Sequence, residues 1–160
     1  MEDAERDAVA PEPASRPAAE AEPVRHVVFR LASERYALPL DAVREVVVPQ
    51  APFARVPRAS EAVRGVMNLR GRVVAVVDLA SLVGLPPQPL VAGSGHVLLL
   101  DRDKRALGLL VGGVLGVEPL PPVEPGSGVV RGVASARVGA VTLLAPDALA
   151  AEAASLFGGR

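Results

Sequence analysis

From residue 25 onward, short apolar runs alternate with polar or glycine-containing turns along the chain. Brief runs centred on valine and leucine predict β-strands, and the tight turns between them predict hairpins. Residues 46–50 are expected to be extended, and a short segment, residues 112–117, follows the first hairpin of the second half. The predicted strands are residues 26–31, 36–40, 64–69, 72–78, 96–101, 105–111, 129–136 and 139–144.

Three short helical turns and one longer helix are predicted beside these strands. A longer helix is expected at residues 146–157, where proline occupies the first helical position and apolar residues recur at helical spacing. Each short turn begins with a polar residue that can accept a backbone hydrogen bond. The expected N-caps are Asp41 for residues 41–45, Ser60 for residues 60–63 and Asp78 for residues 79–83, with Gly84 as the stop.

Two sequence echoes indicate an internal duplication. The string VRGV occurs at residues 63–66 and again at 130–133, an offset of 67, and PLDAVREV at 39–46 is echoed by LVGGVLGV at 110–117, an offset of 71. In both halves the order is hairpin, short turn, second hairpin and helix. We infer two similar all-β units, with room for an exchange of end strands. Short strands with many turns favour small closed barrels, because closure leaves no exposed sheet edge.

A connection rich in proline and glycine, residues 84–95, separates the two units. We therefore expect a first barrel at about residues 25–88, a second at about residues 95–145, and then the C-terminal helix. The chain of 160 residues is long enough for this body to bury a core.

Residues 1–24 have a different composition from the rest of the chain. They contain seven acidic residues, two arginines, seven alanines and four prolines. Such a segment cannot bury enough apolar surface to offset the entropy of ordering, so we expect a disordered tail that aids solubility. Two basic against seven acidic residues give the tail a formal charge of −5, whereas 15 basic and 11 acidic residues give residues 25–160 a charge of +4.

Residues that commonly carry catalysis or bind metals are sparse. The chain has no cysteine, which excludes disulfides, thiol nucleophiles and thiolate metal sites. His26 and His96 open strands at matching places in the two halves, and Asp101 and Asp103 flank a turn, so all four indicate structural roles. The chain also lacks a glycine-rich phosphate loop and the metalloprotease and hydrolase motifs. We predict no enzymatic activity, no cofactor and no metal site.

Nucleic acids and membranes are also disfavoured as partners. The net charge is −1, and only four aromatic residues are available as stacking platforms for bases. A small-barrel protein that binds nucleic acid remains an alternative, as does a catalytic protein. No apolar run is long enough to span a bilayer, and the acidic N-terminus lacks the features of a signal peptide, so we expect a cytoplasmic protein without direct membrane insertion.

Recognition of another protein is the remaining class, and the hairpin at residues 63–78 is its best candidate. Alternate residues of a strand share a face. The mixed polar face would carry Arg64, Val66, Asn68 and Arg70, and the core face Gly65, Met67 and Leu69. The polar face is either simply solvated or a rigid patch that offers a guanidinium fork and an amide to a partner. Glycine at position 65 would allow another backbone to approach closely.

Three blocks of sequence resemble the CheW-like domain of bacterial chemosensory systems. They are FRLASERYALPLDAVREVV, VRGVMNLRGRVVAVVDLASLVGL and VLLLDRDKRALGLLVGGVLGV, in this order. The resemblance runs from about residue 27 to residue 156, and the hairpin RGVMNLRGRVVAVVDL is its most specific part.

This resemblance implies a fold and a set of partners. The fold would be two intertwined five-stranded SH3-like barrels with short helices and a C-terminal helix. The function would be that of a non-enzymatic adaptor, which links the helical hairpin tips of chemoreceptors to the regulatory domain of a CheA-type histidine kinase. Other CheW-like domains are further partners within the arrays. Receptor tips would dock in the groove between the barrels, and the resemblance identifies no kinase-binding residue in this chain.

The resemblance also implies receptor-binding residues. The glutamate of DAVREV falls on Glu45 and the arginine of NLRG on Arg70, and these two are expected to form an ion pair that fixes the groove wall for an amphipathic receptor helix. The remaining expected groove residues are Asn68, Val43, Val46, Gly65 and Val66.

Two positions depart from the pattern of the family, and both lie in the second half. Gly112 and Ala145 stand where aspartate is usual, and the second change removes an N-cap worth about 1 kcal/mol from the last helix. The acidic tail is also outside the family pattern. The alternative within the family is a divergent scaffold that serves surface motility or another non-flagellar output.

Overall fold

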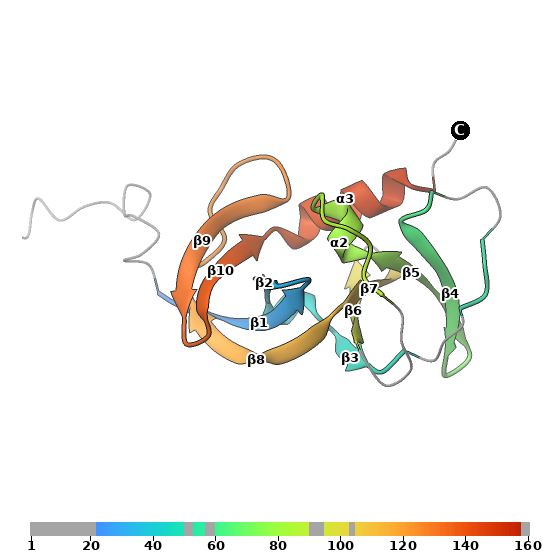
Figure 1. Cartoon of the computed structure of the whole chain (residues 1–160), viewed down its shortest axis with the longest axis horizontal. Coiled ribbons are helices and arrows are strands. Elements are labelled where there is room, and N and C mark those ends of the chain that lie inside the picture. The colour runs from blue at the N-terminus through green and yellow to red at the C-terminus, as the bar shows by residue number, and fades with distance from the viewer. Residues whose placement is uncertain (1–21, 50–52, 57–59, 90–94, 103–104, 158–160) are drawn as a thin grey trace, which may run out of the picture.

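The computed structural model describes residues 22–49, 53–56, 60–89, 95–102 and 105–157. Within these ranges the chain forms ten strands, two α-helices and one 3₁₀ turn (Figure 1). The elements are β1 (Val24–Leu31), β2 (Glu34–Pro39), η3 (Leu40–Ala42), β3 (Glu45–Val47), β4 (Val63–Leu69), β5 (Arg72–Asp78), α2 (Leu79–Leu82), β6 (His96–Arg102), β7 (Arg105–Val111), β8 (Gly113–Leu120), β9 (Val130–Ala136), β10 (Gly139–Leu144) and α3 (Pro146–Ser155).

The strands form two five-stranded sheets, each of them an SH3-like barrel. One sheet has the order β8-β1-β2-β10-β9 and is called the terminal barrel, because it contains the first and last strands. The other has the order β3-β6-β7-β5-β4 and is called the central barrel. Each barrel contains one parallel pair at the equivalent place, β2 with β10 and β7 with β5. The predicted all-β fold of two intertwined barrels is therefore confirmed.

The barrels are not the contiguous segments expected from the sequence. The first hairpin pairs with β8 and β10 rather than with β3 to β5, and the β6–β7 hairpin joins the central barrel. The ranges 25–88 and 95–145 therefore do not delimit the barrels, because each half gives its first hairpin to the other barrel. The last helix ends at Ser155, close to the expected boundary. Of the predicted tail, residues 1–21 lie outside the described part of the chain.

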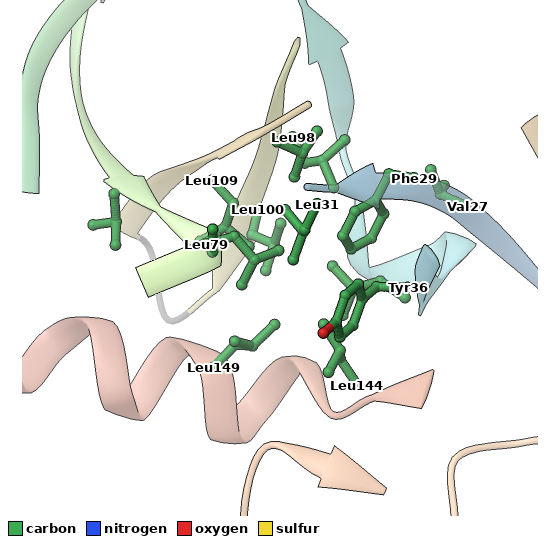
Figure 2. Close-up of a cluster of buried hydrophobic side chains, with 14 of the residues drawn as sticks. Val27, Phe29, Leu31, Tyr36, Leu79, Leu98, Leu100, Leu109, Leu144 and Leu149 are labelled. Atoms are coloured by element: carbon green, nitrogen blue, oxygen red, sulfur yellow. The ribbon is translucent and has the colours of Figure 1, made fainter. Parts of the chain in front are cut away.

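The largest hydrophobic core lies between the barrels rather than inside either one. Alternation along β1 sends Val27, Phe29 and Leu31 into this shared core, whereas Val28 packs inside the terminal barrel. Figure 2 shows Leu149 of α3 pointing into the same cluster as residues of β1 and of the central barrel. The smaller interior of the central barrel contains Phe53, Val76, Val97 and Leu110. Because the largest core is shared, burial of apolar surface holds the two barrels together.

Local capping follows the sequence expectations only in part. Ser60 caps a single turn as expected, since its hydroxyl accepts a hydrogen bond from the N–H of Ala62. Asp41 is not an N-cap: it lies inside η3, which follows Pro39, and the chain then enters β3 because Glu45 pairs with Leu99 of β6. Asp78 precedes α2 but makes no capping hydrogen bond.

Candidate functional site

The β4–β5 hairpin closes through a tight turn that places an arginine in a left-handed conformation. Arg70 has φ +52° and Gly71 has φ +87°. Two consecutive residues with positive φ suit the twist of a two-residue hairpin. The side-chain carbonyl of Asn68 accepts a hydrogen bond of 2.9 Å from the N–H of Gly71. Asn68 therefore supports the turn that presents Arg70.

Arg70 and Glu45 form a bidentate ion pair, as the resemblance implied. The two guanidinium nitrogens lie 2.5 and 3.0 Å from the two carboxylate oxygens. Glu45 belongs to β3 and Arg70 follows β4, and these strands are the two edges of the central sheet. The pair thus spans the seam at which the central barrel closes.

The pair is accessible to solvent. The side chain of Arg70 is 67% exposed and that of Glu45 is 29% exposed. The hydrogen bonds from Arg70 hold the pKa of the Glu45 carboxyl below its usual value, and the carboxylate raises the pKa of Arg70. An exposed pair of this kind contributes little to stability, so its main effect is geometric.

A second charged group lies on the strands next to the two edges, and sequence reasoning missed it. Asp101, at the end of β6, lies 2.6 Å from Arg44 and 3.9 Å from Arg72. Asp101 was expected to end a strand and flank a turn, with only a structural role; the structure places it in that strand, but between two arginines. Asp103 lies outside the described residues. No local pattern connects positions 44, 72 and 101, because only the pairing of β3, β5, β6 and β7 brings them together.

Apolar side chains accompany the charges. Val46 and Val48 are 39% and 64% exposed, and Val73, which pairs with Asn68 across the hairpin, is 70% exposed. Val43 packs partly against the core that the two barrels share. The expected residues Val43, Glu45, Val46, Asn68 and Arg70 therefore lie on β3 and the β4–β5 hairpin or beside them.

Gly65 and Val66 are placed differently from the rest of the expected groove. A Cβ atom on Gly65 would lie 2.4 Å from the carbonyl oxygen of Ala54 and 2.7 Å from the Cβ of Phe53. Val66 exchanges two backbone hydrogen bonds with Ala54. The close backbone approach predicted at Gly65 is thus made by the chain's own residues 53–54. Gly65 is buried, so it contributes to the site through the course of the backbone.

Arg64 was expected on the polar face with Arg70 but points elsewhere. The register of β4 and β5 shifts between Val63 and Gly65, so Arg64 occupies a β-bulge. Its guanidinium donates to the carbonyl of Gln88 at 2.6 Å and lies 3.6 Å from the carboxylate of Asp78. Burial raises the pKa of Asp78, against the effects of hydrogen bonds from Ser81 and Gln88 and the charge of Arg64.

The described residues contain no cluster of three or more histidine, aspartate or glutamate side chains able to hold a metal ion. Among the same residues, no helix is long and apolar enough to cross a membrane. The candidate functional site is the exposed Glu45–Arg70 pair with the apolar side chains of β3 and the β4–β5 hairpin beside it.

The two intertwined barrels and the exposed ion pair across the central seam can be compared with known protein families. Residues 25–153 match the family profile described as the CheW-like domain. This chain belongs to the CheW-like domain family.

Several characterised proteins resemble parts of the chain. The probable chemotaxis protein CheW of Rhizobium etli is 32% identical over 89 residues, 55% of this chain and 56% of that protein. The chemotaxis protein CheW of Thermotoga maritima is 33% identical over 90 residues, 56% and 57% of the two chains. Protein PilI of Pseudomonas aeruginosa is 30% identical over 105 residues, 60% and 58% of the two chains. The matched regions span a little over half of each relative.

A solved structure has the same fold. The scaffolding protein TtCheW from Thermoanaerobacter tengcongensis superposes with a TM-score of 0.64 at 26% sequence identity, and the match covers 77% of this chain and 89% of that one. The likeness therefore includes most of both barrels.

Proposed function

We propose that this chain is a non-enzymatic adaptor that couples chemoreceptors to a CheA-type histidine kinase in a chemosensory array. Membership of the CheW-like family and the names of its relatives support the proposal. The observation that carries it is the bidentate Glu45–Arg70 pair, which lies accessible to solvent across the barrel seam. Arg70 has a turn conformation that costs free energy, and its guanidinium is held in a fixed position and is accessible to solvent. Both features suit binding of a partner better than a role in stabilising the fold.

The chemistry of this surface fits an amphipathic helix. Val46 and Val73 offer apolar contacts, while Arg70 and Asn68 offer hydrogen bonds beside them. A receptor hairpin in the cytoplasm would supply such a helix, with its apolar residues recurring along one face. The adaptor would then act on the kinase by position alone, at membrane-associated or cytoplasmic receptor arrays.

Charge reversal at Arg70 tests the proposal. The Arg70→Glu variant should lose binding to a purified receptor cytoplasmic hairpin, because two carboxylates would face each other on the seam. Its thermal unfolding should stay close to that of the wild type, because the lost pair is exposed. The matched control is Arg137→Glu, which changes an arginine in the equivalent turn of the terminal barrel and should bind normally. Retained binding by the Arg70 variant would refute the assignment.

A divergent scaffold serving a different pathway is the second candidate. Protein PilI matches over 105 residues at an identity similar to that of the proteins named CheW. The two candidates differ in which receptor and kinase bind, so co-purification with the receptors and kinases of the source organism separates them.

A further inference from the structure

The two barrels carry an arginine in the same unusual position. Arg64 and Arg131 are the second residues of the repeated VRGV strings, and the strand register skips each of them. The following glycines, Gly65 and Gly132, have φ values of +138° and +150°. A β-bulge turns the side chain of its extra residue away from the regular alternation. Each bulge therefore redirects one guanidinium group.

The two arginines reach different partners. Arg131 donates to the carbonyls of Gly128 and Glu124, at 2.8 and 3.0 Å, in the loop that precedes its own strand. Arg64 instead reaches Gln88, in the connection between α2 and β6, and the buried carboxylate of Asp78.

Asp78 and Arg64 hold both polar groups of the Gln88 backbone. The N–H of Gln88 donates to the carboxylate of Asp78 at 3.0 Å, and the carbonyl of Gln88 accepts from Arg64 at 2.6 Å. Ser81 of α2 donates a further hydrogen bond of 3.0 Å to Asp78. The side chain of Asp78 is fully buried, so these contacts compensate the cost of its desolvation.

The held segment lies at the crossover between the barrels. Gly112 connects β7 of the central barrel with β8 of the terminal barrel, and it exchanges two hydrogen bonds with Arg30 of β1, at 2.8 and 2.9 Å. A Cβ atom on Gly112 would lie 3.0 Å from the side-chain oxygen of Gln88 and 2.9 Å from the carbonyl oxygen of Arg30. Glycine at this position is what allows Gln88 to approach the crossover.

We propose that Arg64, Asp78 and Gln88 form a polar clasp that fixes the orientation of the central barrel relative to the terminal barrel. Asp78 and Arg64 are then positioning residues: they touch no partner, but they hold Gln88 against the crossover. The consequence for partner binding rests on the proposed function, whereas the orientation itself does not.

The distance between the barrels gives the direct test. The chain has no cysteine, so Ser135→Cys in the terminal barrel and Glu61→Cys in the central barrel can each carry a spin label, both at exposed positions. The neutral double variant Arg64→Met/Asp78→Asn removes the ion pair without leaving a buried charge. Its distance distribution, measured by double electron–electron resonance, should shift or broaden relative to the labelled parent. Arg131→Met should keep the parent distribution, and an unchanged distribution in the double variant overturns the proposal.

A second variant keeps the test decisive if the double variant folds poorly. Gly112→Ala retains both charges, but its Cβ would crowd the Gln88 side chain and the carbonyl oxygen of Arg30. It should therefore change the same distance in a folded protein. If that variant leaves the distance unchanged, the clasp does not set the orientation. Binding of the receptor hairpin should weaken several-fold in each clasp variant and not in Arg131→Met. If the wild type binds no receptor, the proposed function fails while the distance result still decides the clasp.

Discussion

The seams of the two barrels are closed by different groups at equivalent turns. In the central barrel the guanidinium of Arg70 bonds the carboxylate of Glu45. The offset of 67 residues places Arg137 at the equivalent turn of the terminal barrel, and there the backbone N–H, rather than the side chain, donates to the carboxylate of Glu118 at 2.9 Å. A backbone contact is therefore sufficient at such a turn. The exposed side-chain pair of the central barrel is not required by the fold, which favours a role in recognition.

The exposed surfaces of the barrels differ in the same way. The offset of 71 residues places Gly116 at the position equivalent to Glu45, so one partner of the ion pair is missing from the terminal barrel. Both barrels expose apolar side chains, and those on the edge strands of the terminal barrel are Leu115, Val117, Val130 and Val133. The duplication has thus kept the strand order in both barrels while the charged contacts differ, and the predictions below compare equivalent positions.

The largest difference is expected between the two bulge glycines. Gly65→Ala should lower the free energy of unfolding by about 3 kcal/mol or more, because the new Cβ meets backbone at 2.4 Å in a strained conformation. Gly132→Ala should cost only about 1–2 kcal/mol, since its nearest neighbour is the Glu124 side chain at 3.6 Å. Chemical denaturation measures both losses. Equal losses would show that the contact with residues 53–54 is not rigid.

The next difference concerns the histidines that open equivalent strands. His26 is fully buried, its Nδ1 lies 2.7 Å from the carbonyl of Val24, and its Nε2 has no partner among the described residues. Burial lowers its pKa, with smaller opposing effects from Val24 and Asp41. The unfolded chain then binds more protons than the folded one, so stability should fall as the pH drops below about 6.5, by at most about 1.4 kcal/mol per pH unit.

Thermal unfolding between pH 7.5 and 5.5 tests this difference. The His26→Leu variant should have a flatter pH dependence than the wild type. The matched control is His96→Leu, which changes the histidine at the equivalent strand start; the Nδ1 of His96 accepts a hydrogen bond from the N–H of Val114. Identical slopes in the wild type and the His26 variant would contradict the assignment.

Local sequence patterns predicted the hairpins well because each depends on neighbouring residues. The turn at Arg70-Gly71, the core face of Met67 and the stop at Gly84, which has φ +85°, follow from such patterns. The duplication left room for an exchange of strands, but the local patterns did not say which strands exchange. The pairing of β1 with β8 joins positions about ninety residues apart, such as His26 and Glu118.

The same reason explains which site residues could be found. Glu45 and Arg70 came from the family resemblance, and the structure brings them together. The contact of Asp101 with Arg44 depends on long-range strand pairing. The inward direction of the Arg64 side chain depends on a β-bulge. Neither feature leaves a local sequence signal. Asp78 carried an N-cap signal, but its carboxylate bonds Gln88, ten residues away.

The smallest expected effect concerns the residues that precede the two helices. The offset of 67 residues makes Ala145 the equivalent of Asp78, and α3 begins without a side-chain cap. Ala145→Ser should raise the free energy of unfolding by about 1 kcal/mol, because the hydroxyl can accept a hydrogen bond in the first turn. Ala145→Asp should instead destabilise the protein, because position 145 is only 4% exposed and Arg131 is engaged by loop carbonyls.

Thermal unfolding of the two Ala145 variants separates capping from charge. A gain for both variants would mean that a carboxylate at this position finds compensation in the terminal barrel. A gain for serine and a loss for aspartate would mean that a buried carboxylate before the helix is tolerated only where a bulge arginine faces it, as Arg64 faces Asp78. In each barrel, the residue before the helix and the direction of the bulge arginine would then depend on each other. This dependence would make Asp78 and Arg64 of the clasp a single unit.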